Sequence, residues 1–208
     1  MRHTVRVIVA SLLAMPLAAT VATGPSVAAS PERTKTTTQQ VNANTIVVGS
    51  FPGVMGNYHQ VTIGVRVSDT STEMDGYLTS FVCKDPTTTQ PWIYCEYVDA
   101  NLLQSPNPVV KVGSRLTYST LSGTLHVVNY SNETLASDVP IALRVTREGG
   151  LTTVRSMYSR TEPDGTKYRY TETSTTAFGP VTGTVAGTDV VSEDGYFVEV
   201  KATGIVVG

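Results

Sequence analysis

The sequence predicts a single all-β domain, an antiparallel β-sandwich or barrel-like sheet of about ten strands, placed after a signal peptide. Val, Thr and Tyr, which favour strands, are abundant, and only 15% of the residues are charged. Between 61 and 68, apolar residues alternate with polar residues or glycine, which indicates a strand with one buried face. Turn signals recur at short intervals, and no segment has helical periodicity, as is typical of sandwiches and barrels.

The first thirty residues have the pattern of a secretory signal peptide. Arg2 and Arg6 give a basic start without an acid, and an apolar segment and then small residues follow. The apolar segment is too short for a comfortable membrane span. Residues 1–29 are therefore predicted to be a signal peptide, cleaved after Ala29 or alternatively after Ala28, and the protein is expected to be secreted and extracellular.

The mature chain is expected to begin with a mobile segment. Residues 30–44 contain one sizeable aliphatic residue, Val41, among polar residues. Such a composition cannot bury enough apolar surface to order itself. Residues 30–44 are therefore predicted to be a flexible leader, and residues 45–208 to form the all-β domain.

Four strands are expected in the first half of this domain. Residues 45–48 are an apolar, mostly β-branched run, and 61–67 have the clean alternation of a half-buried strand. The turn Asp75-Gly76 precedes a third strand at 77–84. A polar loop then leads to a fourth strand at 92–98.

Glycine-containing turns divide the rest of the chain. Ser122-Gly123 separates two short strands, and Asp164-Gly165 is predicted to join two longer strands as a two-residue hairpin loop. The predicted strands are 116–120, 124–130, 140–146, 152–161, 168–176, 181–185, 190–191, 196–203 and 205–207.

The charge balance argues against two classes of partner. Loss of Arg2 and Arg6 with the signal peptide takes Lys and Arg from 15 to 13 against 17 Asp and Glu, so the formal charge goes from −2 to −4. Nucleic-acid-binding proteins concentrate positive charge, and anionic membrane surfaces attract it. No nucleic-acid partner is therefore expected. After the signal peptide the sequence contains no second long apolar segment, so no membrane span is predicted.

Cys83 and Cys95 are the only cysteines. They lie in two strands joined by a loop, and direct pairing across an antiparallel hairpin places Phe81 opposite Tyr97, with Tyr77 on the same face. In an exported chain with two cysteines, this predicts a disulfide, which contributes roughly 3 kcal/mol. Two free buried thiols are the alternative.

Several motifs together resemble a known group of proteins. They are Gly76-Tyr77 before Cys83, then Val98–Leu102 (VDANL), Leu121–Tyr130 (LSGTLHVVNY) and Thr182–Thr188 (TGTVAGT). The chain resembles uncharacterised exported β-rich proteins of high-GC Gram-positive bacteria over most of its mature length. The resemblance implies a β-rich fold and an exported origin, and it implies no catalytic residue.

No metal or other cofactor is predicted. His59 and His126 are the only histidines after processing, and zinc lacks ligands once the cysteines are paired. Asp69, Glu73 and Asp75 make an oxygen-rich loop, but their spacing does not fit the helix-loop-helix calcium site. A solvated turn is the preferred interpretation of this loop.

No catalytic residue is predicted. The chain lacks Gly-x-Ser-x-Gly, and the two histidines fit strand positions better than a Ser-His-Asp triad. Glu96, Glu172 and Glu199 lie in predicted strands, but nothing in the sequence brings two of them together for glycoside hydrolysis.

The hairpin around Asp164-Gly165 contains four of the five candidate ligand-binding residues. A two-residue loop places Arg160 opposite Arg169, next to Tyr168 and Tyr170. Like charges across a ladder destabilise it, so a bound anion would relieve the repulsion while tyrosines stack on sugar rings. The preferred alternative is a solvated hairpin whose glutamates pair with the arginines. Trp92 is the fifth candidate, as a carbohydrate platform or as packing over the sheet edge.

These features favour an exported, non-enzymatic β-domain that binds a cell-surface polymer, with carbohydrate or protein as the expected partner. The alternative is a secreted hydrolase, or an inhibitor of one, without a recognisable motif. A third hypothesis is an envelope protein that assembles through exposed strand edges.

Overall fold

The computed structural model describes residues 31–85, 87–88, 91–130 and 134–207, without the side chains of Trp92 and residues 191–193. The predicted signal peptide lies outside the described residues. The elements are β1 (Glu32–Val48), β2 (Tyr58–Val67), β3 (Thr72–Cys83), α1 (Pro91–Tyr94), β4 (Cys95–Gln104), β5 (Val109–Val112), η1 (Ser114–Leu116), β6 (Tyr118–Asn129), β7 (Leu135–Thr146), β8 (Thr152–Thr161), β9 (Lys167–Val185), β10 (Thr188–Asp189) and β11 (Val191–Val207).

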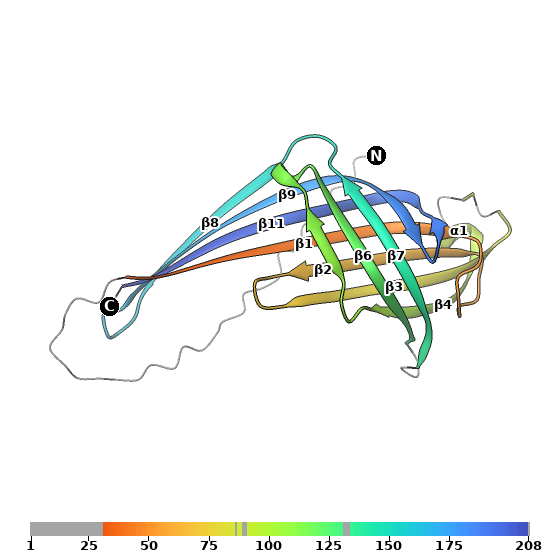
Figure 1. Ribbon diagram of the computed structural model, residues 1–208, viewed down its shortest axis with the longest axis horizontal. Helices are drawn as coiled ribbons and strands as arrows, with labels where there is room; N and C mark the ends of the chain where they lie inside the picture. The colour runs from red at the N-terminus through yellow and green to blue at the C-terminus, as the bar shows by residue number, and fades with distance from the viewer. Residues whose placement is uncertain (1–30, 86, 89–90, 131–133, 208) are drawn as a thin grey trace.

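The all-β prediction is confirmed, and the sheet is antiparallel and barrel-like. Within the described residues, eight strands follow one another in the order β9, β11, β1, β2, β3, β4, β6 and β7, and β7 pairs back onto β9. In Figure 1, β6 and β7 cross in front of β1, β2 and β3. None of the described helices is long and apolar enough to cross a membrane.

This closed part, the body, has a core made by strict alternation. Val61, Ile63 and Val65 of β2 are at most 1% exposed, whereas Thr62 between them and Arg66 after them are exposed. The alternation that the sequence shows from 61 to 67 is therefore the register of a strand with one face on the core. The strands around it repeat the pattern, so the inner face of the body forms the main apolar core. A smaller apolar cluster of Ile46, Tyr58, Phe81 and Cys83 lies apart from it.

A second part, the arm, extends from the body as one twisted layer (Figure 1). It consists of β8 and of the ends of three strands, namely 32–40 of β1, 167–176 of β9 and 198–207 of β11, in the order β8-β9-β11-β1. All ten residues of β8 are exposed. No residue of the arm belongs to either hydrophobic cluster of the described chain, so this sheet has no core beneath it.

The flexible-leader prediction for residues 30–44 is wrong over 32–44. Glu32 to Ala43 pair with β11, and residues from Gln39 onward also pair with β2. Low hydrophobicity predicts disorder because it cannot form a core. Here the backbone is ordered by ladder hydrogen bonds to β11 instead, and residues 32–36 stay exposed.

The end of the body away from the arm carries the disulfide. Cys83 and Cys95 are bonded and lie opposite each other, with Phe81 opposite Tyr97, as predicted. Tyr77 lies on the same face of β3 as Phe81 and Cys83, as predicted, because β3 pairs with β2 in an unbroken register from Thr72 to Phe81. The bulge at this point belongs to β4, where Val98 is the extra residue. The predicted strand at 92–98 is a short helix, α1, followed by β4.

Candidate functional site

The arm has two chemically different faces, because side chains alternate along each strand and directly paired residues share a face. One face, here called the cationic face, continues the core side of the body. The registers of β1 with β11, of β11 with β9 and of β9 with β8 place six cations on it. The six are Arg33, Lys35, Arg155, Lys167, Arg169 and Lys201.

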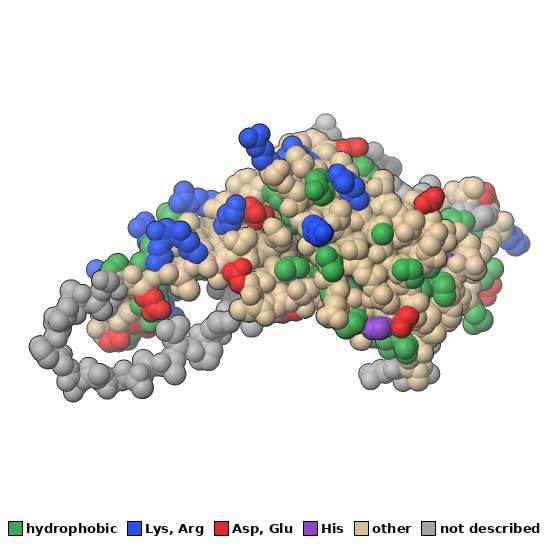
Figure 2. Space-filling model, in the orientation of Figure 1, with side chains coloured by type: hydrophobic (Ala, Val, Ile, Leu, Met, Phe, Trp, Pro, Cys, Tyr) green, Lys and Arg blue, Asp and Glu red, His purple; other side chains and the backbone are tan. Residues whose placement is uncertain are grey.

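Among the strand residues of the arm, one acidic residue lies on the cationic face. Glu199 shares the cationic face and forms an ion pair with Lys201, with 2.6 Å between Oε1 and Nζ. Figure 2 shows Lys and Arg side chains gathered along the arm, although the chain as a whole has more acids than bases. The remaining positions are mostly hydroxyl-bearing, namely Thr37, Thr153, Ser159, Thr161, Thr171, Thr173, Thr175 and Thr203.

The cations have a regular spacing. Lys167 and Arg169 are two residues apart on β9, as Arg33 and Lys35 are on β1, and two residues of a strand span about 6.7 Å. Arg33 and Arg169 lie in one row across the sheet with Ile205 between them, at about 10 Å from strand to strand. The face therefore presents positive charges at intervals of about 7–10 Å over some 20 Å of strand.

The opposite side, the tyrosine face, carries three of the predicted binding residues. Arg160 lies opposite Tyr168, with its Cζ 5.9 Å from the ring centroid, and pairs with the Glu162 carboxylate. The Tyr170 hydroxyl donates a hydrogen bond to Glu172 Oε2 at 2.9 Å. Burial, together with this bond and the carboxylate charge, raises the pKa of Tyr170 to about 12.

The predicted pairing of Arg160 with Arg169 is wrong by one residue. Arg160 pairs with Tyr168 and Ser159 with Arg169, so the two arginines lie on opposite faces of the hairpin. Pro163 explains the difference, because a two-residue Asp164-Gly165 loop would make Pro163 and Thr166 a hydrogen-bonded pair, and proline has no N–H to donate. The loop instead closes between Glu162 and Thr166, with Gly165 at φ 90°, as in a type I turn followed by a bulge.

Trp92 is not part of this surface. It belongs to α1, which Figure 1 places at the end of the body away from the arm. Its side chain lies outside the described residues. Of the five predicted site residues, the structure brings together Arg160, Tyr168 and Tyr170, and puts Arg169 on the reverse side of the same sheet.

The two described histidines, His59 and His126, make different contacts. His59 is buried, and its ring nitrogens contact Ser80 Oγ at 2.9 Å and the Gly49 carbonyl at 3.1 Å. A carbonyl accepts only from N–H, so Nε2 carries the proton and Nδ1 accepts from Ser80. Burial lowers the pKa of His59, and the imidazole is a neutral structural partner.

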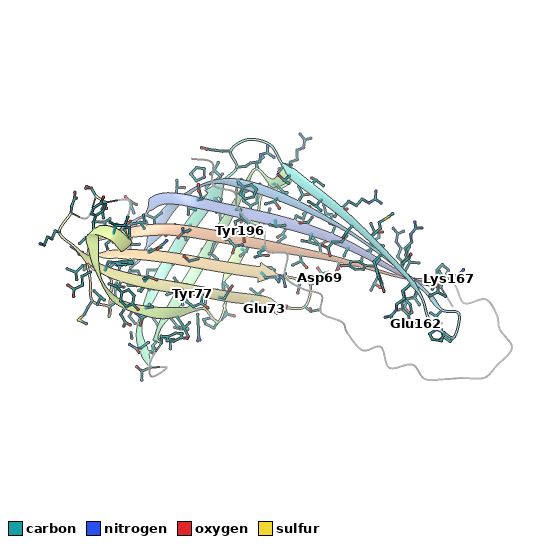
Figure 3. The ribbon with its side chains drawn as sticks, turned by 180° about the vertical axis from the view of Figure 1, so that it is seen from behind. Asp69, Glu73, Tyr77, Glu162, Lys167 and Tyr196 are labelled. Atoms are coloured by element: carbon teal, nitrogen blue, oxygen red, sulfur yellow. A yellow bond between two sulfur atoms is a disulfide. The ribbon has the colours of Figure 1, made fainter. Side chains whose placement is uncertain are left out.

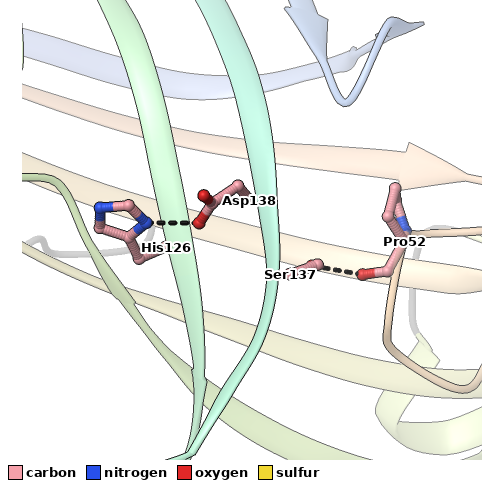
Figure 4. A network of polar contacts seen from close by, with 4 residues as sticks. All are labelled: Pro52, His126, Ser137 and Asp138. Atoms are coloured by element: carbon pink, nitrogen blue, oxygen red, sulfur yellow. Dashed lines mark hydrogen bonds and ion pairs between the residues drawn. The ribbon is translucent and has the colours of Figure 1, made fainter.

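His126 is held by Asp138, opposite it on β7 (Figure 4). The nearest serine in sequence to this pair, Ser137, does not complete a triad. Its hydroxyl donates to the Pro52 carbonyl at 2.6 Å and ties the loop after β1 to β7. The contacts of His126 and Ser137 are therefore those of two separate structural links.

Comparison of the chain with protein-family models, with curated proteins and with solved structures gives no match.

Proposed function

We propose that the protein is exported through its signal peptide and acts as a non-enzymatic binding domain that holds a linear anionic polymer of the cell surface on the cationic face. The observation that carries the proposal is the segregation of six cations with one acid on one face of an arm. Because the arm is a single layer, one extended ligand can contact side chains along the whole cationic face.

The cations of the cationic face do not stabilise the arm. Like charges in neighbouring positions of a sheet destabilise it, and no core is formed there. A polymer with phosphate or carboxylate groups would offset this repulsion with charge-assisted hydrogen bonds. The threonine and serine hydroxyls between the cations would add neutral donors and acceptors.

Export selects the class of polyanion. With the signal peptide removed, the formal charge is −4, so the protein as a whole repels anions and any attraction is confined to the arm. An exported domain meets wall and surface glycopolymers rather than nucleic acid. The disulfide between Cys83 and Cys95 fits an oxidising compartment.

Binding of the mature domain to long-chain polyphosphate and to isolated anionic wall polymer tests the proposal. Lys35→Gln with Lys167→Gln removes two exposed charges from the cationic face, and Lys84→Gln with Lys111→Gln removes two exposed charges from the body. The arm variant should bind more weakly, and the slope of log affinity against log salt should fall by about one to two. The body variant should bind like the unaltered protein.

Three outcomes would reject the proposal. Equal loss in both variants would mean that the arm is not the site. Preference for an oligonucleotide of equal charge would make the partner a nucleic acid. Shortening of the polymer during incubation would make the protein a hydrolase.

A further inference from the structure

A second surface lies on the outer face of the body, on the side of the sheet opposite to the cationic face. One row of directly paired residues crosses five strands there, in the order Phe178, Tyr196, Asn42, Gly64 and Asp75. Their neighbours along each strand face the core, so the five side-chain positions point outward. Figure 3 shows this side, with Tyr196, Tyr77 and Glu73 labelled over the body.

Gly64 is the centre of this row because it has no side chain. A Cβ atom there would lie 2.8 Å from Asp75 Oδ1 and 3.0 Å from Asn42 Oδ1, so both neighbours lean over the glycine. No positive φ requires a glycine at this position. A glycine inside a strand weakens it, and close approach of another group is the usual reason for its presence.

Polar groups converge at this point without satisfying one another. Asn42 Nδ2 is buried and has no hydrogen-bond partner among the described residues. Burial and the nearby Asp75 charge raise the pKa of Tyr196, which keeps its hydroxyl protonated and able to donate. An unpaired buried amide costs about 1–3 kcal/mol, which a ligand oxygen would recover.

A hollow lies next to this row, on the side toward the arm. Gln40, Arg66 and Glu73 are register partners one step toward the arm, and with Met74 and Asp75 they line a space of about 360 Å³. This volume lies at the lower end of the range of small-ligand sites. The lining mixes donors with acceptors, and a guanidinium beside two carboxylates suits hydroxyl groups better than a metal ion.

Exposed aromatic rings lie on the same face of the sheet, outside the five residues that line the hollow. Phe178, 45% exposed, lies against Tyr196 with ring centroids 5.9 Å apart. Tyr77, 53% exposed, follows Asp75 on the same face of β3. Between β11 and β3 there are three strand spacings, or about 14 Å, which is wide enough for a sugar ring to lie between the aromatic groups.

We infer that this hollow binds a neutral saccharide unit, whose hydroxyls meet Asn42, Asp75 and Tyr196 while its apolar face packs on an exposed aromatic ring. Sugars carry both kinds of surface, and flat aromatic rings next to amides and carboxylates match them. The inference is independent of the proposed polymer site, because the hollow shares no residue with the cationic face and lies on the other side of the sheet.

The test uses ¹⁵N-labelled mature domain with three neutral disaccharides at millimolar concentration, namely cellobiose, maltose and N,N′-diacetylchitobiose. At least one should shift the amide signals of Asn42, Gly64 and Asp75. Gly64→Ala should keep the fold, since the atoms it meets belong to side chains, and should weaken binding at least about tenfold. Gly204→Ala is the matched control, on the same outward-facing side of the sheet but in the arm, where the nearest atom is 3.4 Å away.

Two results would overturn the inference: no shift at these three residues with any of the disaccharides, or undiminished affinity in a folded Gly64→Ala variant. If Gly64→Ala proves unstable, Asp75→Asn, which keeps the size of an exposed side chain, must weaken binding for the inference to stand. Polyphosphate binding should be unchanged in Gly64→Ala, so the two sites can fail separately.

Discussion

Replacing the two arginines of the β8–β9 hairpin one at a time should change stability in opposite directions. Arg169→Gln removes a cation from the cationic face, where its closest charged neighbours are Lys167 and Arg33. Arg160→Gln removes a cation that pairs with Glu162 and lies over the Tyr168 ring. Glutamine keeps the length of the side chain, so the charge is what changes.

The magnitudes follow from strand geometry. Lys167 is about 6.7 Å and Arg33 about 10 Å from Arg169, which in water at ~0.1 M salt gives repulsions of about 0.3 and 0.15 kcal/mol. Arg169→Gln should therefore raise the free energy of unfolding by about 0.5 kcal/mol. Arg160→Gln loses an exposed ion pair and a cation–π contact, each worth at most about 1 kcal/mol, and should lower it by roughly 1 kcal/mol.

Urea denaturation measures both effects without adding salt. The gain in Arg169→Gln should disappear at ~1 M NaCl, where screening acts over about 3 Å. A register that placed the arginines opposite each other would make both variants more stable and couple them in the double variant. That outcome, or a loss of several kcal/mol in Arg169→Gln, would refute the assignment of the two arginines to opposite faces.

Three further predictions concern the body. Replacing Cys83 and Cys95 together with alanine should lower the free energy of unfolding by about 3 kcal/mol and the Tm by roughly 6–12 °C, measured by calorimetry. The free energy of unfolding should also fall as the pH drops through about 6.5. Buried His59 has a lowered pKa and stays neutral while the unfolded chain takes up the proton, and a His59→Gln variant should lose this dependence in pH-resolved urea titrations. Gly183→Ala, at φ 122° with its Cβ 2.0 Å from a main-chain oxygen of β7, should cost about 3 kcal/mol or more or prevent folding, as circular dichroism would show.

Local patterns were sufficient to predict the fold class and the disulfide, because each depends on neighbours in the chain. Both the buried face of residues 61–67 and the pairing of Cys83 with Cys95 could be predicted because successive side chains of a strand point to opposite faces. The helical turn at Pro91 has no such signal, so Trp92 is placed in a helix rather than in the predicted strand. The hairpin register depends on Pro163, which lacks the N–H that the pair flanking a two-residue loop would need.

The cationic face was missed because its residues come from four strands, of which β1 is far in the sequence from β8, β9 and β11. Short signals exist, such as Arg33 with Lys35 and Lys167 with Arg169, each pair two residues apart. They gain meaning once a common register is known, and within the arm the register of β1 with β11 pairs residues more than 150 positions apart. No local pattern specifies that pairing, since neither a turn nor a short loop connects the two strands.

One alternation runs through body and arm, and a change of residue type along it marks where the core ends. In β1, Val41 and Ala43 point into the core of the body and are buried. Further along the strand, in the arm, the side chains on the same face are Thr37, Lys35 and Arg33. The same change occurs in β9 and β11, where apolar inward residues give way to threonine and cations. Cations at inward positions prevent other strands from packing on that side, because burying an unpaired charge costs several kcal/mol. The composition that keeps the arm a single layer is therefore also what makes it a surface for anions.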